Sequence, residues 1–355
     1  MRRVTGLWPQ VIARENLEAA FHAARSGKRS RDDVASFSLS WERELRRLHD
    51  ELQQRSYEPG AYRQFVIYER KARLISAAPF RDRVVHHALM RVVEPLLDRR
   101  MYFHSYACRV GKGVHGAVKS YQGWARRYAY VLKLDIRQYF PSIDRILLLA
   151  EIERYVKDPG CLWLFARIVN GAPPTEGVAS LFPGDNLLTA LERPRGLPIG
   201  NLTSQVLANL YLSRLDHWIT AHHRGGYLRY VDDLLLLGDD KAALWAMRES
   251  VEERLAALRL RLHPNKAHVM RTDRKVDVLG YQVSRGKRWL RGENPQRAGR
   301  RLRGLARGYA QSRLRWRDVQ QSIHAWIGHA MHADTLGLRR SVLSRIVFRR
   351  ARVRA

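Results

Sequence analysis

Three aspartates stand at the ends of short apolar runs. Asp135 ends the run Tyr130–Asp135 (YVLKLD), and Asp232 and Asp233 follow a tyrosine and a valine further along the chain. A carboxylate at the end of a buried strand is costly without a partner, and two adjacent carboxylates repel each other until a cation lies between them. Mg²⁺ takes oxygen ligands and keeps positions open for phosphate. Two such ions about 3.5–4 Å apart activate a 3′-hydroxyl and stabilise the leaving oxygen. The three aspartates therefore predict a nucleotidyl-transfer site with two Mg²⁺ ions, for which Mn²⁺ is a substitute.

A second pair of adjacent aspartates provides an internal comparison. Asp239 and Asp240 follow the apolar residues 234–237 and precede an Ala-rich helical stretch over residues 241–247. Acidic residues at that position cap a helix and favour its dipole. We therefore assign Asp239 and Asp240 to capping. Capping or a solvated turn is also the alternative interpretation of any isolated Asp-Asp pair.

The elements that must position the aspartates follow from the apolar spacing. Spacing typical of helices, alternation typical of strands, and a Gly- and Pro-rich stretch can each be recognised. We expect helices over residues 10–58 with a break at 27–31, and over 81–97, 203–222 and 241–258; paired strands over 62–76; a strand over 130–135, followed by a helix capped by Ser142 and Asp144; a hairpin over 226–238 with Asp232 and Asp233 at its turn; and a loop over 171–195.

The charge balance indicates a polyanionic partner. The 355 residues carry 64 Lys and Arg against 34 Asp and Glu, which gives a formal charge of +30. Such an excess repels itself unless a polyanion neutralises it, and nucleic acid is the usual one. The alternative is a generally basic protein from a GC-rich genome, in which Arg replaces Lys.

The expected cellular compartment follows from three features that the sequence does not show: a membrane-spanning run, a leader core and a disulfide framework. No apolar run approaches the ~18–20 residues needed to span a bilayer, and the basic start has no apolar core after it. The two cysteines, Cys108 and Cys161, form no disulfide framework and have no metal-ligand spacing, so both are interpreted as buried packing residues. We expect a cytoplasmic protein with no membrane contact.

The order of these segments resembles the palm of reverse transcriptases over nearly the whole chain. Asp135 matches the lone aspartate of the first palm motif, and the resemblance implies that Ile136 offers its backbone carbonyl to a metal. Residues 230–233 match the YxDD box. Phe140 falls where this family places a steric gate that clashes with a ribose 2′-hydroxyl. The alternative for Phe140 is an aromatic residue of the core.

Further matches to that family surround these motifs. Lys71 and Arg73 match the fingers motif that grips the incoming triphosphate, and Lys266 matches a lysine that protonates the departing pyrophosphate. Leu279-Gly280-Tyr281 resembles the primer grip, where a tight turn lays backbone against the primer end. The alternatives are an exposed basic hairpin for the first pair and a solvated side chain for Lys266.

One stretch of sequence differs from most reverse transcriptases. Residues 196–205 hold Ile199-Gly200 and Ser204-Gln205 where most members have Gln-Gly and Ser-Pro. This departure resembles the enzymes of diversity-generating retroelements, whose cDNA is mutated at template adenines. It places Ile199, Gly200 and Gln205 at the nucleotide, where Ile cannot make the hydrogen bonds of Gln. Alternatively, Ile199 is an apolar substitution without effect on fidelity. The loop over 171–195 is longer than expected for that group and fits stand-alone bacterial enzymes.

The resemblance implies an α+β right-hand architecture. We expect fingers with an N-terminal helical segment over residues 1–125, a palm over 126–285 and a basic helical thumb over 286–355. The implied partners are an RNA template, the RNA–DNA duplex, dNTPs and a small helical accessory protein. A phage-defence enzyme remains an alternative, as does a non-catalytic RNA-binding protein on a polymerase scaffold. The three carboxylates argue against the last, because they would repel a phosphate backbone.

Overall fold

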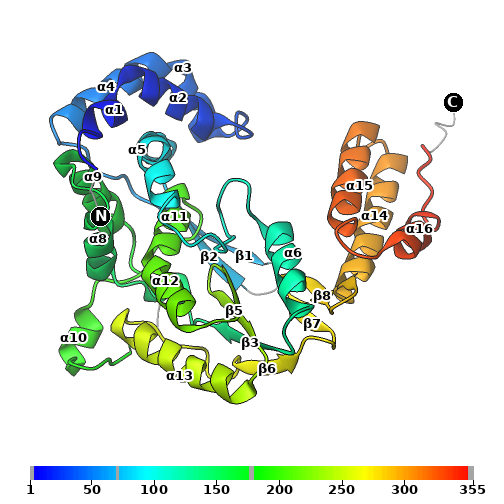
Figure 1. Ribbon diagram of the computed structural model, residues 1–355. Coiled ribbons are helices and arrows are strands. Elements are labelled where there is room, and N and C mark those ends of the chain that lie inside the picture. Colours follow the sequence, from blue (N-terminus) through cyan, green and yellow to red (C-terminus); the bar gives the residue numbers. More distant parts are fainter. Residues whose placement is uncertain (1–3, 69–71, 176–179, 351–355) are drawn as a thin grey trace, which may run out of the picture.

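The computed structural model describes residues 4–68, 72–175 and 180–350. Helices surround three small antiparallel sheets, so the predicted α+β class is confirmed (Figure 1). One large hydrophobic core joins the N-terminal helices to one face of the central sheet, and a smaller core lies on the other face.

The N-terminal helices pack around one long helix, α5 (Phe80–Asp98). Phe21 stacks on Trp41 with ring centroids 5.5 Å apart and meets Phe80 edge-on, which fixes these helices on α5. The predicted helical region is confirmed as far as Gln53, with further breaks at Ala13 and Ser40, whereas residues 55–58 are not helical. Its helices are α1 (Trp8–Ile12), α2 (Arg14–Arg25), α3 (Asp32–Leu39) and α4 (Trp41–Gln53).

The predicted paired strands form a two-stranded sheet. Strand β1 (Arg63–Tyr68) pairs with β2 (Ala72–Ala77), so that Arg63 lies opposite Ala77. The apolar side chains of this hairpin are largely exposed, which leaves it available to cover a ligand.

The central sheet has the strand order β4-β5-β3-β6, and every pairing is antiparallel. Leu132 and Leu134 point to the large core, whereas Val131 points to the smaller one. Because strand side chains alternate, Asp135 shares the face of Val131. The strands are β3 (Tyr130–Asp135), β4 (Gly226–Tyr230), β5 (Asp233–Gly238) and β6 (His268–Arg271).

Different helices cover the two faces of this sheet. Helix α6 (Val114–Ala125) lies on the face of Val131, and the opposite face packs against helices of the large core (Figure 1). Those that contribute to the large core are α8 (Arg145–Glu153), α9 (Pro159–Asn170), α11 (Leu202–Tyr211), α12 (Ser213–His222) and α13 (Lys241–Ala257). Two short helices are α7 (Tyr139–Ser142) and α10 (Leu187–Glu192), of which α10 interrupts the predicted loop.

The capping predictions are confirmed in part. Asp144 accepts the N–H groups of Ile146 and Leu147 and caps α8. Asp240 accepts the N–H of Ala242 and caps α13. The assignment of Asp239 to capping was wrong. Its Oδ1 accepts the N–H of Ala129 at 2.8 Å, because the loop before β3 runs closer to it than the helix does.

The C-terminal part combines a third sheet with a helical bundle (Figure 1). The sheet order is β7-β8-β9, and β9 contains Trp289, which lies in the stretch expected to be helical. The elements are β7 (Val276–Val278), β8 (Tyr281–Val283), β9 (Arg288–Leu290), α14 (Glu293–Ala310), α15 (Trp316–Ala330) and α16 (Leu336–Leu343).

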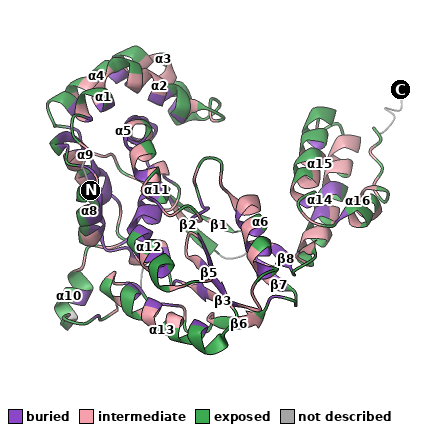
Figure 2. Ribbon diagram, viewed as in Figure 1, coloured by how far each residue is buried: buried purple, intermediate pink, exposed green. Residues whose placement is uncertain are grey.

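Buried residues are concentrated in α11, α12 and the central strands (Figure 2). The burial of individual residues corrects one prediction about the cysteines. Cys161 is buried as expected, but Cys108 is exposed, so its assignment as a packing residue was wrong. Its backbone has φ +53° in the loop before α6, which turns the residue outward. In the described ranges, no helix is both long enough and apolar enough to traverse a membrane.

Candidate active site

The strand register places the three aspartates at one end of the central sheet. Asp135 is the last residue of β3 and lies directly opposite Asp233, the first residue of β5. Asp232 occupies the turn before β5, where its carbonyl accepts the N–H of Ile136 at 3.1 Å. The hairpin turn predicted for Asp232 and Asp233 is therefore present, beside the end of the predicted strand.

The site is electrostatically strained. Burial, reinforced by the neighbouring carboxylates of Asp233 and Asp135, raises the pKa of Asp232 to about 6. Burial also raises the pKa of Asp233, opposed by the ammonium of Lys133. Carboxylates held together against their own repulsion are a binding site for cations.

Two lysines supply positive charge at the site. Lys266 Nζ donates to Asp135 Oδ2 at 2.7 Å. Lys133 shares the face of Asp135 and donates to the carbonyl of Asp277, and burial lowers its pKa. The sequence analysis missed Lys133, although a lysine inside the apolar run YVLKLD is the signal that could have found it.

The three aspartates offer oxygen donors of the kind that a divalent ion prefers. Within the ranges that the structure describes, no three metal-binding side chains stand close enough to form a ready ligand set. The carboxylates are nonetheless hard oxygen donors that repel one another, which fits Mg²⁺. Lys266 engages one carboxylate oxygen of Asp135, Oδ2, and the second carboxylate oxygen can still serve as a metal ligand.

A buried ion pair supports the turn that carries Asp232. Arg229 is fully buried in β4, pairs with both carboxylate oxygens of Asp216 and donates to the carbonyl of Val231 at 3.1 Å. Val231 adopts φ +57°, a left-handed conformation that is strained for a β-branched residue. The guanidinium therefore holds a strained turn in place. Sequence reasoning missed Arg229, whose signal is a charge within the otherwise apolar strand GYLRY.

Phe140 and the Ile199 segment lie side by side. Phe140 is half-buried, and its carbonyl accepts the N–H of Leu197 at 2.9 Å. The carbonyl of Ile199 accepts the N–H of Ser76 at 3.0 Å, which ties this segment to β2. Gly200 has φ +119°, and a Cβ there would lie 3.0 Å from Ile75, so glycine is required for this close approach.

The remaining predicted site residues differ in exposure. Arg73 is exposed on β2, and Gln205 is exposed on α11. Lys71 lies outside the described residues. Their predicted roles in nucleotide binding stay predictions.

The predicted primer-grip motif forms a two-residue turn between β7 and β8. Leu279 has φ +48° and Gly280 φ +91°, which places both in left-handed backbone. Tyr281 is buried, and its hydroxyl contacts the Nδ1 atoms of His115 and His329. Because the Tyr281 side chain is buried, the part of this motif that can contact another molecule is the turn at Leu279 and Gly280.

Comparisons with known proteins give one family and several distant relatives. The family model described as "Reverse transcriptase (RNA-dependent DNA polymerase)" matches residues 64–283. "Protein YkfC" of Escherichia coli K12 is 25% identical over 283 residues, covering 68% of this chain and 71% of that protein. The "Putative COX1/OXI3 intron 1 protein" of Saccharomyces cerevisiae is 23% identical over 147 residues, covering 41% of this chain but only 16% of that protein.

Solved structures with a similar chain path include two telomerases. That of apo telomerase from Candida tropicalis gives a TM-score of 0.48 at 11% identity, covering 68% of this chain and 59% of that one. That of telomerase from Candida albicans with a telomeric RNA fragment gives 0.46 at 13% identity, covering 83% and 56%.

The matched segment covers more than half of the chain and includes all three aspartates. The chain therefore belongs to the reverse transcriptase family and is an RNA-directed DNA polymerase.

Proposed function

We propose that this enzyme joins deoxynucleotides on an RNA template by two-metal transfer, with Asp135, Asp232 and Asp233 holding two Mg²⁺ ions. The observation that carries the proposal is the register of β3 and β5, which sets Asp135 opposite Asp233 and beside Asp232. The N–H of Ile136 contacts the Asp232 carbonyl, and we assign the Ile136 carbonyl as a further metal ligand by family resemblance. The metal pair supplies activation of the 3′-hydroxyl and charge stabilisation of the pyrophosphate.

The protein's own groups perform the remaining tasks in this proposal. Lys71 and Arg73 bind the triphosphate from the β1–β2 hairpin, because Arg forms bidentate contacts with phosphate. Phe140 excludes a ribose 2′-hydroxyl. Lys266, which contacts Asp135 at 2.7 Å, would pass a proton to the pyrophosphate oxygen. The nucleotide lies over Ile199 and Gly200, with Gln205 further along α11.

The wider architecture follows the same proposal. Fingers span residues 1–125, the palm 126–285 and the thumb 286–355. The turn at Leu279, Gly280 and Tyr281 meets the primer end through its backbone. The RNA template and RNA–DNA duplex run between palm and thumb, in a cytoplasmic setting.

Primer extension on poly-rA with oligo-dT, dTTP and Mg²⁺ tests the proposal. Asp232→Asn should lower the rate by more than about a hundredfold, since several kcal/mol of charge stabilisation are lost. Asp240→Asn is the matched control, because it changes an aspartate that caps α13 and an asparagine caps equally well. Equal activity of wild type and Asp232→Asn would favour a contaminating polymerase and a non-catalytic RNA-binding role for this chain.

We further propose that the enzyme is error-prone and belongs to a diversity-generating retroelement, with a small helical accessory protein as partner. The supporting observation is Ile199, which lies between the Phe140 segment and β2 and has no polar side-chain atom to check nucleotide geometry. A stand-alone or phage-defence enzyme is the alternative. Ile199→Gln should lower misincorporation opposite template adenine, measured by sequencing of the cDNA. An unaltered error spectrum would remove this argument.

A further inference from the structure

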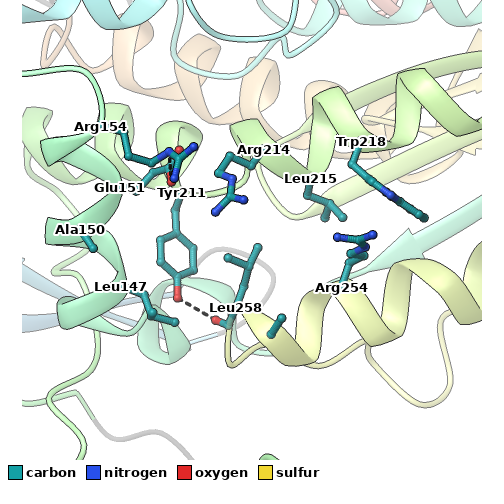
Figure 3. A pocket seen from close by; sticks show the side chains of 11 residues that line it. Leu147, Ala150, Glu151, Arg154, Tyr211, Arg214, Leu215, Trp218, Arg254 and Leu258 are labelled. Atoms are coloured by element: carbon teal, nitrogen blue, oxygen red, sulfur yellow. Dashed lines mark hydrogen bonds and ion pairs between the residues drawn. The ribbon is translucent and has the colours of Figure 1, made fainter. Parts of the chain in front are cut away.

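A cavity of about 330 Å³ lies among α8, α11, α12 and α13 (Figure 3). Its apolar lining comes from side chains on all four helices or their ends. These are Leu147, Ala150, Tyr211, Leu215, Trp218, Ala257 and Leu258. Tyr211 is anchored by its hydroxyl, which donates to the carbonyl of Leu258 at 2.7 Å, so this wall is fixed.

The cavity lies on the side of the sheet away from the candidate active site. Helices α12 and α13 pack on the face of Leu132 and Leu134. Asp135 and Asp233 belong to the opposite face, the face of Val131. The polymerase chemistry therefore gives the cavity no role.

Cationic side chains surround this apolar floor. Arg154, Arg214 and Arg254 line the cavity, and all three residues are exposed. In the described part of the chain, Arg214 makes no hydrogen bond. Arg254 lies over the ring of Trp218 with its guanidinium carbon 4.8 Å from the centroid (Figure 3). The buried Trp218 Nε1 lacks a hydrogen-bond partner among the described residues.

One carboxylate is already built into the wall. Glu151 accepts from the hydroxyl of Tyr155 at 3.2 Å, and Arg154 lies 3.7 Å from its second oxygen. This carboxylate offsets only part of the positive charge. The cavity thus combines an apolar floor, an unpaired indole N–H and an excess of guanidinium groups.

A second hollow extends the surface. It has a volume of about 190 Å³, shares Arg154 with the first, and adds Leu96, Leu97, Arg99 and Arg100. Two apolar hollows joined through an arginine suit an extended occupant better than a single small molecule.

We propose that these two hollows are a docking site for an acidic amphipathic segment of a partner protein. Apolar side chains of the segment fill the hollows, and its carboxylates pair with Arg154, Arg214 and Arg254. A nucleic acid would satisfy the arginines but has no aliphatic side chains to fill the apolar floor of the cavity. The proposal stands independently of the proposed function.

The test uses a short fluorescein-labelled peptide with Glu and Leu at helical spacing, and fluorescence anisotropy with the full-length protein. Saturable binding is expected, with no binding of the same peptide carrying Lys in place of Glu. Arg214→Glu removes one of the cations that would pair with the peptide. Ala150→Trp fills the cavity with a large side chain, and because Ala150 is exposed the substitution should not disturb the core. Each variant should weaken peptide binding at least about tenfold. Arg43→Glu is the matched control, an exposed charge reversal on α4 that should leave the affinity unchanged.

Three results would overturn the proposal: no saturable binding of the acidic peptide, an affinity indifferent to both Arg214→Glu and Ala150→Trp, or an equal loss in Arg43→Glu. Oligo-dT serves as a competitor that distinguishes an acidic protein segment from a nucleic acid. If oligo-dT at an equal concentration of negative charge displaces the peptide, the surface is a nucleic-acid site instead. Thermal unfolding confirms that each variant is folded. Primer extension should stay unchanged in all variants, which separates failure of this proposal from failure of the polymerase assignment.

Discussion

The charge around Asp232 is balanced by lysines. Lys266 holds Asp135, and Lys133 lies on the same face of the sheet. An ammonium is a compact charge on a flexible stem, whereas a guanidinium forms a rigid fork with a carboxylate. A lysine can therefore give way to a metal ion more readily than an arginine in the same place.

The Phe140 ring gives a prediction about sugar selection. Phe140→Ala should open space for a 2′-hydroxyl and lower the preference for dTTP over rUTP by about tenfold or more. The measurement is kcat/KM for each nucleotide on poly-rA with oligo-dT. Phe103→Ala, which removes an aromatic ring that is 66% exposed elsewhere, is the control. Unchanged rejection of rUTP would assign Phe140 to the core alone.

At this scale, local sequence indicated where the candidate ligands lie, whereas their role in metal binding stays a prediction. Asp135, Asp232 and Asp233 were selected because carboxylates beside apolar runs need a partner, and the register brings them together. Asp239 was misassigned, since its true partner, the N–H of Ala129, is distant in sequence. Arg229 was missed for the same reason, as its partner Asp216 lies on another element.

At the scale of elements, the β4–β5 hairpin depends on one buried ion pair. Arg229→Met should lower the free energy of unfolding by about 3–5 kcal/mol, because Asp216 is left charged and buried. The double variant Arg229→Met/Asp216→Asn should recover part of that loss, since the asparagine oxygen still accepts from Tyr227. Denaturant titration measures both. A loss below about 1 kcal/mol in the single variant would show that the pair is dispensable.

Helix α5 carries a built-in sensitivity to acid. His86 is fully buried, neither of its ring nitrogens has a hydrogen-bond partner among the described residues, and burial lowers its pKa to about 3. In the unfolded chain, the imidazole of His86 takes up a proton near pH 6.5. In the folded chain it stays neutral at that pH, because burial disfavours the charged form. Stability should therefore fall as the pH drops from about 6.5 toward 3, by up to about 1.4 kcal/mol per pH unit.

Comparison with His86→Leu isolates this contribution. Between pH 7 and pH 5, wild type should lose about 2 kcal/mol more unfolding free energy than the variant. The measurement is urea unfolding at both pH values. Equal losses would mean that His86 is not held neutral in the folded state.

The type of each helix or strand was predicted more accurately than the residues at which it begins and ends. Apolar spacing identified α5, α13 and the β4–β5 hairpin, because each has one side that must be buried. The break at Leu212 between α11 and α12 and the short α10 were not predicted. Such details depend on tertiary packing rather than on local preference.

At the scale of the whole molecule, the +30 charge gives a prediction about salt. Affinity for an RNA–DNA duplex should fall about a thousandfold or more between 50 and 200 mM salt, if the protein neutralises about six to ten phosphates. Arg301→Ala, on exposed α14, should reduce the slope of log affinity against log salt by about one. Arg43→Ala on α4 is the control. A salt-insensitive affinity, measured by filter binding, would contradict the electrostatic account.

The α+β right-hand class was predictable, whereas the arrangement of the sheets was not. The class followed from the order of motifs, which the family match confirms. The strand order β4-β5-β3-β6 and the inclusion of Trp289 in a third sheet depend on pairings between distant segments. Register is set by those pairings, so composition and local periodicity could not supply it.

The central claim is that Asp135, Asp232 and Asp233 jointly bind two divalent ions. The most direct measurement is anomalous diffraction from Mn²⁺ in crystals with primer, RNA template and a non-hydrolysable dNTP. The account predicts two Mn²⁺ ions at the end of β3, both lost in Asp233→Asn. Ions bound elsewhere, or a site in which Asp135 keeps its bond to Lys266 and touches no metal, would contradict it.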